Sequence, residues 1–363
     1  MSRATRIPEP YSIRINDLRN EIRKRRLDAY FVQDRMDQYW LTGFTGEDGG
    51  VLVTPRQVVL LTDGRFDEAA EHEAPWARKV LRKKRGPEAT VRELRRLRVR
   101  RVGFNGGHMT VSDFNALRKL GRPIRLVPIP SPIQPRRAVK TPAEVARIRT
   151  AVGVAEQAFE AVRKWLRPGL SEREIAARLA YEMRQRGAQG EAFPSIVAVG
   201  PNSSLPHYEP GDRRLTETEL LLVDWGARVN WYGSDLTRVV WLGSIPAQLR
   251  KVFDVVREAQ ARGIEAVRPG ARAAAVDRAA RQVIDKAGFG KRFNHALGHG
   301  IGLVGHEAPR VGKLSTDVLE PGMVVTIEPG IYLPGIGGIR LEDDVLVTET
   351  GHEVLSTLPV SFA

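Results

Sequence analysis

Four carboxylates and one histidine in the second half of the chain form its strongest chemical pattern: Asp224, Asp235, His299, Glu328 and Glu342. They lie in five short motifs, which read LLVDWGA, YGSDLTR, GHGIG, TIEPG and GIRLEDD. Carboxylate oxygens and imidazole nitrogens bind divalent metal ions, and such ions can turn water into a hydroxide nucleophile at neutral pH. The pattern therefore predicts metal-assisted hydrolysis at a site for two divalent ions.

The two aspartates stand beside segments with the composition of buried strands. Asp224 follows the apolar run Leu220–Val223, and Asp235 precedes a second apolar run, LTRVVWL. Neighbouring strands would bring both carboxylates to one place, where a cation or a proton must offset their repulsion. Alternatively, Asp235 is only a helix-capping or turn residue.

Three of the seven histidines, His295, His299 and His306, fall within 12 residues. Glycines on both sides of His299 allow close approach of the backbone, which suits an imidazole in an open groove. This clustering favours a site, although one or two of the three could be hydrogen-bonded core histidines.

The two glutamates stand at the ends of apolar strands. Glu328 precedes a Pro-Gly turn, and Glu342 opens the strand that follows the loop YLPGIGG. Their carboxylates can face each other or point to solvent, and the spacing alone leaves both arrangements open.

The first third of the chain alternates helix and strand patterns, which is typical of an α/β sheet. The expected elements are a helix over Ile15–Arg26, strands over Ala29–Gln33 and Val99–Phe104, and a hairpin of Val51–Thr54 with Val58–Asp63. The proline-rich segment Val127–Pro135 is expected to be a linker, because proline interrupts helices and central strands. This predicts two domains, residues 1–137 and 138–363.

The second domain contains an internal repeat. A capping box at Thr141–Glu144 starts a long helix that runs to about Leu166, and a second capping box begins at Ser171. The ending LRPG of the first helix returns 101 residues later as VRPG, again followed by a helix, expected over Ala273–Ala287. Two copies of helix, helix, strand, strand predict a pseudo-twofold domain, and metal sites often lie between such halves.

Together, the five motifs resemble those of the pita-bread metallopeptidases, the group of methionine aminopeptidase, Xaa-Pro aminopeptidase and Xaa-Pro dipeptidase. The resemblance covers essentially the whole chain and implies a mixed α/β (α+β) protein, with a creatinase-type N-terminal domain before a pita-bread domain. It implies that Asp224 holds one metal, that Asp235 and Glu342 bridge both, and that His299 and Glu328 complete the other.

The same resemblance assigns further residues around a metal-bridging hydroxide. Glu328 would accept its proton, His306 would donate to the carbonyl or tetrahedral intermediate, and His207 would contact substrate. His295 would line a proline pocket. Arg340 would orient Asp224, and Thr237 would support the metal site in a similar way. The ligand set suits two Mn(II) ions and would also accept Co(II), Zn(II) or Fe(II).

Within this family, the segments YWLTGFTGEDGGVLVT and LTDGRF favour an Xaa-Pro aminopeptidase that removes the residue before proline, acting as a homodimer. The alternative is an Xaa-Pro dipeptidase restricted to dipeptides. Glu47 and Asp48 keep it open, because they stand where a small Ser-Ala pair is common and would attract a short substrate's free amine.

Composition limits which cellular compartment and which kinds of partner are expected for this protein. The 363 residues include no cysteine, no apolar run long enough to span a membrane and no signal-like start, so a cytoplasmic protein is expected. The net charge is +14, and Arg78–Arg101 holds 12 Lys/Arg against 2 Asp/Glu. We interpret this stretch as a solvated helix face, since no aromatic residue interleaves it, and disfavour a non-catalytic nucleic-acid-binding relative.

Overall fold

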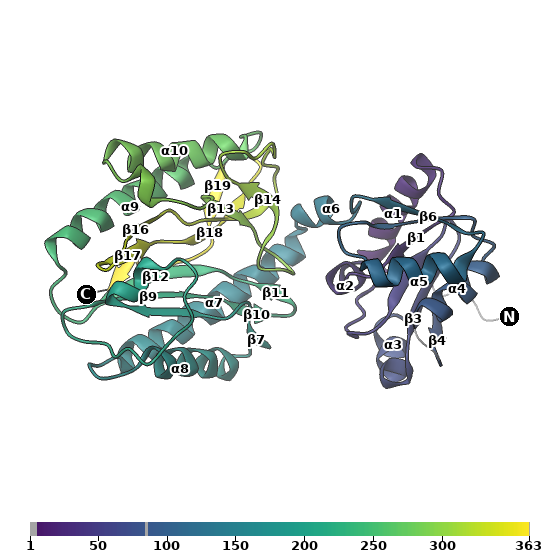
Figure 1. Cartoon of the computed structure of the whole chain (residues 1–363), viewed down its shortest axis with the longest axis horizontal. Helices are drawn as coiled ribbons and strands as arrows, with labels where there is room; N and C mark the ends of the chain where they lie inside the picture. Colours follow the sequence, from purple (N-terminus) through teal and green to yellow (C-terminus); the bar gives the residue numbers. More distant parts are fainter. Residues whose placement is uncertain (1–5, 84–85, 363) are drawn as a thin grey trace. The chain divides into compact units, whose positions relative to one another are not determined.

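The computed structural model describes residues 6–83 and 86–362, and it divides into two compact units, Met1–Arg136 and Arg137–Ala363 (Figure 1). The N-terminal unit contains the helices α1 (Tyr11–Lys24), α2 (Arg35–Thr42), α3 (Asp67–Glu73), α4 (Gly86–Arg96) and α5 (Val111–Gly121), and the start of α6 (Gln134–Ala138). Its strands are β1 (Ala29–Val32), β2 (Gly50–Val53), β3 (Val58–Thr62), β4 (Arg78–Leu81), β5 (Arg101–Asn105) and β6 (Arg125–Ile129).

These six strands form one mixed sheet in the order β4-β3-β2-β1-β5-β6. The expected hairpin is present, because β2 and β3 pair antiparallel from Gly50–Leu61 to Val53–Val58. Strands β1, β5 and β6 run parallel to one another, so all three begin at the same end of the sheet. Apolar side chains of β1, β2, β3 and β5 pack against α4 and α5 to form the core of this unit.

The proline-rich segment is not purely a linker, which corrects the expectation from its composition. Its first residues complete β6, and α6 begins within it. Pro128 is tolerated there because β6 is an edge strand, where a missing backbone donor leaves no ladder partner unsatisfied.

The C-terminal unit has four long helices, α7 (Pro142–Trp165), α8 (Glu172–Gln185), α9 (Ala247–Glu265) and α10 (Ala273–Lys286). Its strands are β7 (Gly190–Glu191), β8 (Ile196–Val199), β9 (Leu220–Trp225), β10 (Ala227–Val229), β11 (Tyr232–Gly233), β12 (Leu236–Trp241), β13 (Gly298–Gly300), β14 (Glu307–Val311), β15 (Val324–Ile327), β16 (Gly330–Leu333), β17 (Gly337–Arg340), β18 (Asp343–Val347), β19 (His352–Val354) and β20 (Ser361–Phe362). Short 3-10 turns are η1 (Gly64–Phe66) in the first unit and η2 (Gly200–Ser204) and η3 (Gly290–Arg292) in the second.

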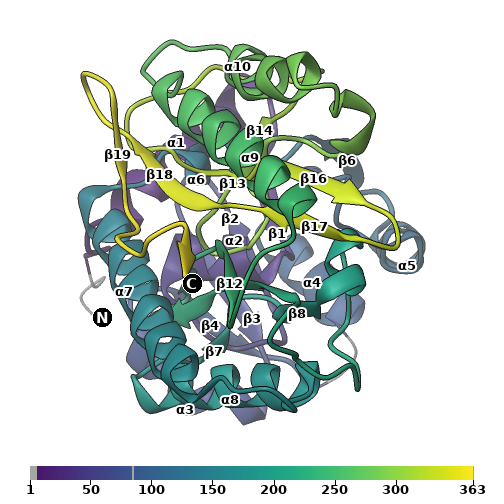
Figure 2. The same cartoon turned by 90° about the vertical axis from the view of Figure 1, so that its left-hand side faces the viewer.

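Local capping chemistry sets the helix starts. Thr141 and Ser171 each form the expected capping box, with Glu144 and Glu174 returning hydrogen bonds to the cap backbone. The strands lie between the α7–α8 pair and the α9–α10 pair, as the predicted repeat requires (Figures 1 and 2). Stacking of Phe159 on Trp225, at 4.4 Å between ring centroids, fixes α7 against β9.

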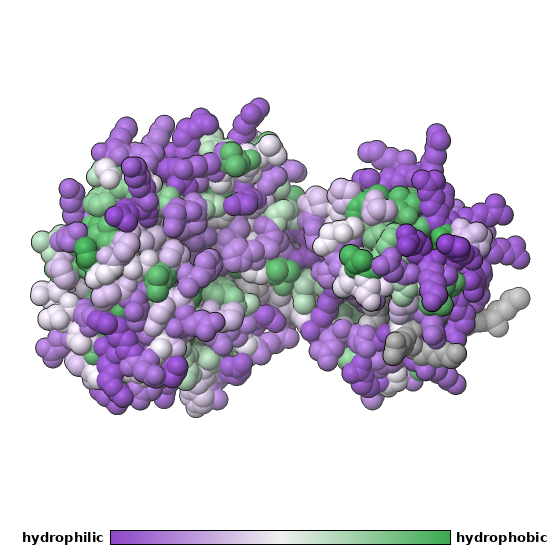
Figure 3. All heavy atoms as spheres, viewed as in Figure 1, coloured by the Kyte–Doolittle hydropathy of each residue, from purple (hydrophilic) through white to green (hydrophobic). Residues whose placement is uncertain are grey.

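Two sheets meet at the centre of this unit. One has the order β20-β12-β9-β8, and the other has the order β14-β13-β15-β18-β19. A β-bridge between Thr237 and Glu342 joins the first sheet to the start of β18. Hydrophilic side chains cover most of the visible face of both units (Figure 3). No helix in the described part of the chain is long and apolar enough to cross a membrane.

Candidate metal centre and its cavity

The five residues singled out as metal ligands line one cavity of about 710 Å³ in the C-terminal unit. Asp224 lies in β9, Asp235 directly before β12, and His299 in β13. Glu328 follows β15, and Glu342 lies between β17 and β18. His207, His295, His306 and Arg340 line the same cavity, whereas Thr237 lies behind it and hydrogen-bonds to Glu342.

Strand register explains why these distant residues meet. Thr237 of β12 pairs with Asp224 of β9 and bridges to Glu342. Strands β15 and β18 pair up to Ile327 and Asp343, so the adjoining Glu328 and Glu342 sit at the same end of neighbouring strands. The two glutamates therefore point into the cavity region rather than to solvent.

The ligand atoms of Asp235, His299 and Glu342 all lie within 4.8 Å of one another, which is close enough to share a metal ion. The Nε2 atom of His299 is 3.4 Å from Glu328 Oε1 and 3.7 Å from Asp235 Oδ2. Carboxylates and an imidazole at these separations are a donor set for Mn(II), Co(II), Zn(II) or Fe(II).

Without a bound cation, holding several ionised carboxylates close together in a buried cavity is electrostatically unfavourable. Burial, with a smaller contribution from the Asp224 charge, raises the pKa of Glu328 to about 8 despite the lowering effect of Arg340. Burial, followed by repulsion from nearby carboxylates, also raises the pKa values of Asp235 and Glu342 well above their ordinary range. Divalent cations would remove this cost by compensating the charges.

Burial has the opposite effect on the histidine of the cluster. It lowers the pKa of His299 to about 3, and the nearby His306 contributes to the same direction. The ring is neutral at neutral pH, with Nδ1 3.2 Å from the Gly300 carbonyl oxygen. If Nδ1 carries the proton and donates it there, Nε2 presents a lone pair to the cluster, as a metal ligand requires.

Arg340 connects several of these groups. Its guanidinium donates to Asp224 Oδ2, to the Tyr332 hydroxyl at 3.0 Å and to Thr237 Oγ1 at 3.3 Å. Burial lowers the pKa of Arg340, but Tyr332, Asp224 and the cluster glutamates outweigh it and raise that pKa overall. The other Asp224 oxygen, Oδ1, is buried without a hydrogen-bond partner among the described residues. An orphaned anionic oxygen in this position fits a metal ligand.

Tyr332 is a site residue that sequence reasoning missed, because it was assigned to the loop YLPGIGG, whereas the structure places it in β16. Its hydroxyl accepts from Arg340 and lies 2.9 Å from His295 Nε2, while His295 Nδ1 lies 2.8 Å from the Ala296 carbonyl oxygen. Burial lowers the pKa of His295 to about 4, so this ring is neutral. Both of its nitrogens are engaged within the protein, and the ring offers substrate an apolar wall.

His306 and His207 lie elsewhere on the cavity wall. The ring of His306 is 3.9 Å from that of His299 between centroids. Its pKa is lowered, chiefly by burial. The residue after it, Glu307, is held by Arg137 at 2.7 Å and Lys140 at 2.9 Å, which anchors the segment that carries His306.

A second group of residues supports the cluster from behind. Asp344 accepts a hydrogen bond from the Asp235 backbone at 3.0 Å, and Arg238 donates to the Glu342 carbonyl oxygen and to Asp343. Within the motif GIRLEDD, sequence reasoning singled out only Arg340 and Glu342, because local spacing does not reveal partners over 100 residues away.

Arg310 of β14 is another missed residue of the cavity. It pairs directly with His299 across β13 and β14, and opposite residues in an antiparallel pair project from the same face. Arg310 lines the cavity, and its guanidinium makes no hydrogen bond or ion pair to any residue that the structure describes. It therefore provides an available positive charge beside the cluster.

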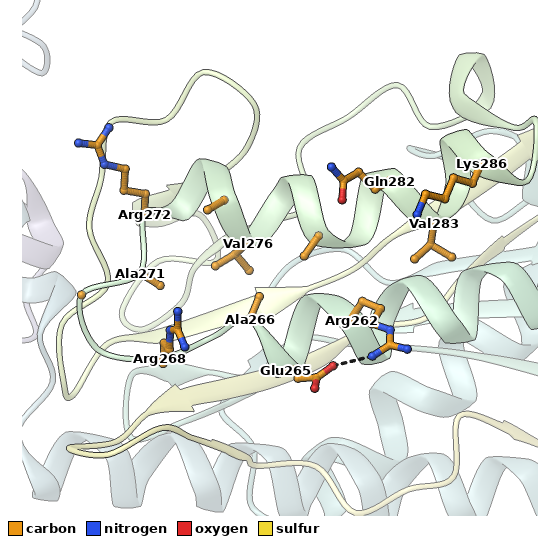
Figure 4. Close-up of a pocket in the computed structure, with 13 residues that line it drawn as sticks. Arg262, Glu265, Ala266, Arg268, Ala271, Arg272, Val276, Gln282, Val283 and Lys286 are labelled. Atoms are coloured by element: carbon orange, nitrogen blue, oxygen red, sulfur yellow. Dashed lines mark hydrogen bonds and ion pairs between the residues drawn. The ribbon is translucent and has the colours of Figure 1, made fainter.

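A second depression, of about 630 Å³, lies between α9 and α10 (Figure 4). Small side chains such as Ala266 and Ala271 form part of its wall, with Arg262, Arg272 and Lys286 around them. It contains none of the carboxylates or histidines discussed above, so it is separate from the candidate metal centre.

Comparisons with known proteins agree with this architecture. Residues 146–349 match the model of metallopeptidase family M24, and residues 14–139 match the creatinase/prolidase N-terminal domain. The chain is 33% identical to the Xaa-Pro dipeptidase of Pyrococcus horikoshii, over 92% of this chain and 93% of the relative.

Two solved structures extend the comparison to three dimensions. An Xaa-Pro dipeptidase from Bacillus anthracis has a TM-score of 0.94 at 33% identity, covering 97% of this chain and 100% of that one. An X-Pro aminopeptidase from Thermotoga maritima has a TM-score of 0.86 at 33% identity, covering 94% and 99%.

The fold and the buried carboxylate–histidine cluster define a metal-dependent hydrolase. More specifically, the chain belongs to metallopeptidase family M24, with a creatinase/prolidase-type domain preceding the catalytic one. The resemblance seen in the five motifs and the expected mixed α/β fold are thereby confirmed.

Proposed function

We propose that this protein is an Xaa-Pro dipeptidase, which hydrolyses the peptide bond between the first residue and proline in dipeptides. The aminopeptidase expected from the N-terminal segments is not confirmed, and the alternative fits better. Relatives that match along most of the chain are named Xaa-Pro dipeptidase or prolidase. The similarity to an X-Pro aminopeptidase keeps longer peptides as the competing substrate class.

The observation that carries the dipeptidase proposal is the available guanidinium of Arg310, projecting from the same face as His299. A dipeptide ends in a free carboxylate one residue beyond the scissile bond, whereas a longer peptide has a neutral amide there. A charge-assisted bond from Arg310 to that carboxylate would favour dipeptides.

Asp224, Asp235, His299, Glu328 and Glu342 would hold two divalent ions, and we propose Mn(II) from the oxygen-rich donor set. When bound, such ions supply Lewis-acid activation of water and of the scissile carbonyl. Glu328 would take the proton of the attacking water. His306 would donate a hydrogen bond to the carbonyl oxygen as charge develops there.

The surrounding residues orient these groups. Arg340 fixes the Asp224 carboxylate, and Thr237 donates from Oγ1 to Glu342 Oε2 at 2.6 Å. His207 would contact the substrate, and the His295 ring would pack against its proline. A homodimer stays a prediction from the family resemblance, testable by light scattering.

The test compares kcat/KM for Ala-Pro, Ala-Pro amide and Ala-Pro-Ala in the wild type and in Arg310→Met. A charged hydrogen bond is worth about 1.5–3 kcal/mol, so Arg310→Met should lower kcat/KM for Ala-Pro by about 10- to 150-fold. The amide should lose less than about threefold, because it lacks the carboxylate. Arg292→Met, an exposed arginine outside the cavity, serves as the control.

Efficient cleavage of Ala-Pro-Ala by the wild type, insensitive to Arg310→Met, would instead establish the aminopeptidase. No cleavage of any of the three by the manganese-loaded protein would limit the assignment to the family.

A further inference from the structure

The positive charge of the chain is concentrated in its N-terminal unit. Residues 1–136 contain 28 Lys/Arg and 16 Asp/Glu, a surplus of 12. Residues 137–363 contain 29 Lys/Arg and 27 Asp/Glu, a surplus of 2. The C-terminal unit, which contains the candidate metal centre and is called the catalytic unit below, is nearly neutral. Its chemistry therefore does not account for the basic character of the protein.

The structure divides the basic stretch Arg78–Arg101 into two parts. Arg78 is paired with Glu93, Lys79 with Asp67 and Glu71, and Arg82 with Asp48 and Asp63. These three cations are therefore neutralised within the unit. The second part, Arg92–Arg101, belongs to a different surface.

That surface forms where three helices end and three parallel strands begin. Helices α1, α4 and α5 end at Lys24, Arg96 and Gly121, shortly before β1, β5 and β6 begin. Because these strands are parallel neighbours, their first residues lie together at one end of the sheet. Helices α4 and α5 also lie side by side (Figures 1 and 2).

Hydrogen bonds join the three connections between these helices and strands to one another. The Asp28 carboxylate accepts from the backbone N–H groups of Arg100 and Arg101, both at 2.8 Å. The Arg95 guanidinium donates to the Leu120 and Arg122 carbonyl oxygens. We call the surface made by residues 23–26, 92–101 and 118–125 the basic end.

The basic end holds 14 Lys/Arg, of which 12 are arginines, and its exposed cations include Arg26, Arg98 and Arg122. Nearby acids balance only a few of them, such as Arg25, which pairs with Glu21. Asp28 is used by backbone donors, and Glu93 is buried between Arg78 and Arg96.

Helix stabilisation accounts for fewer than half of these cations. Basic residues in the last turn of a helix interact favourably with its dipole, and six qualify: Arg23, Lys24, Arg95, Arg96, Arg118 and Lys119. The other eight lie outside those turns, where like charges crowded together oppose folding. An anionic partner would compensate them.

We propose that the basic end binds duplex nucleic acid through its phosphates, without reading sequence. Arginine predominates, and its planar guanidinium contacts phosphate oxygens in pairs. No aromatic residue occurs in the three segments, which disfavours stacking on unpaired bases. Leu120 is the one large apolar side chain exposed in these fully described segments, so little is available to insert into a lipid surface. The linear charge run was interpreted as a solvated face because it did not show this convergence.

The test is fluorescence anisotropy of a labelled 20-base-pair duplex with the full-length, manganese-loaded protein over 50–300 mM KCl. Affinity for a duplex falls with salt with a slope of about −0.9 per phosphate neutralised. The basic-end variant carries Arg92→Gln, Lys119→Gln, Arg122→Gln and Arg125→Gln, which lie outside the catalytic machinery. The control variant carries Arg250→Gln, Arg278→Gln, Lys291→Gln and Lys313→Gln, four exposed cations of the catalytic unit.

We expect salt-sensitive duplex binding, which the basic-end variant weakens by at least about tenfold at 50 mM KCl, with a salt slope shallower by about 2–4. The control variant should change affinity less than about twofold, and both should hydrolyse substrate like the wild type. Equal losses in the two variants would overturn the proposal in favour of diffuse attraction. So would absence of duplex binding, or basic-end-dependent binding to vesicles containing phosphatidylglycerol but not to the duplex.

Discussion

Removing the metal ions should make the catalytic unit progressively less stable as the pH rises from 6.5 to 8. Burial raises the pKa values of Glu328 and Asp344 to about 8. A carboxyl group whose pKa is higher in the folded state stabilises that state fully below its ordinary pKa, and this contribution is lost as the pH rises through the folded value. In this window the unfolded chain has already released both protons, whereas the folded protein still holds them.

Each such carboxyl should lose stability by about 1.4 kcal/mol per pH unit, or about 2 kcal/mol between pH 6.5 and 8. For a unit of this size, that corresponds to a Tm lower by about 4–8 °C per carboxyl. His299 and His295 act weakly in the opposite direction, each adding about 0.4 kcal/mol of stability between pH 6.5 and 8 as the last of the unfolded chain's imidazolium is lost. Their pKa values are lowered to about 3 and about 4, so they reduce stability mainly below pH 6.5, their ordinary pKa.

The assay is thermal unfolding at pH 6.5, 7.25 and 8, with chelator and with excess Mn(II). The metal-free Tm should fall with pH, and the metal-loaded Tm should fall less steeply, because Glu328 is then already ionised as a ligand while Asp344 still titrates. Glu328→Gln should remove about 2 kcal/mol of the metal-free pH dependence, because the amide does not titrate. A metal-free Tm that stays flat or rises over this range would refute the reasoning that these carboxyls are buried and protonated.

Three further predictions concern individual residues. His306→Gln should lower kcat about 10²- to 10³-fold with both metals retained, measured by kinetics and metal analysis, whereas loss of metal would contradict a role in stabilising charge on the substrate. Thr237→Val should weaken metal binding by about 10- to 100-fold in a chelator competition, because Glu342 loses its hydrogen bond, and unchanged affinity would argue against this support. Asp277→Ala should destabilise the protein by about 3–5 kcal/mol in urea, because it leaves the buried Arg281 unpaired, and a change below about 1 kcal/mol would contradict that.

The local elements of the fold could be predicted because short-range chemistry specifies them. The start of α7 follows from Thr141 and Glu144, and the β2–β3 hairpin follows from two apolar runs separated by a short polar turn. The strand β6 was missed because proline counts against a strand unless that strand lies at an edge. Edge position depends on the order of the whole sheet, which the sequence of one segment does not contain.

The candidate metal ligands could be proposed because charged residues adjoining buried strands need a compensating partner. The residues that support these ligands could not be proposed from the sequence. Arg238 meets Asp343, and Arg340 meets Asp224, across more than 100 residues. The position of Arg310 beside His299 depends in the same way on the register of β13 and β14. The basic end was missed for a related reason, since its three segments are separated in the chain and meet only in the parallel sheet.

The most direct test of the central claim is Ala-Pro hydrolysis by the metal-stripped protein as Mn(II) is added, with metal content measured on the same samples. We predict no activity without metal, and an increase that levels off at two ions per chain. Glu328→Gln should remain folded but inactive at every metal concentration. Full hydrolysis by protein free of metal, or full activity of Glu328→Gln, would contradict the account.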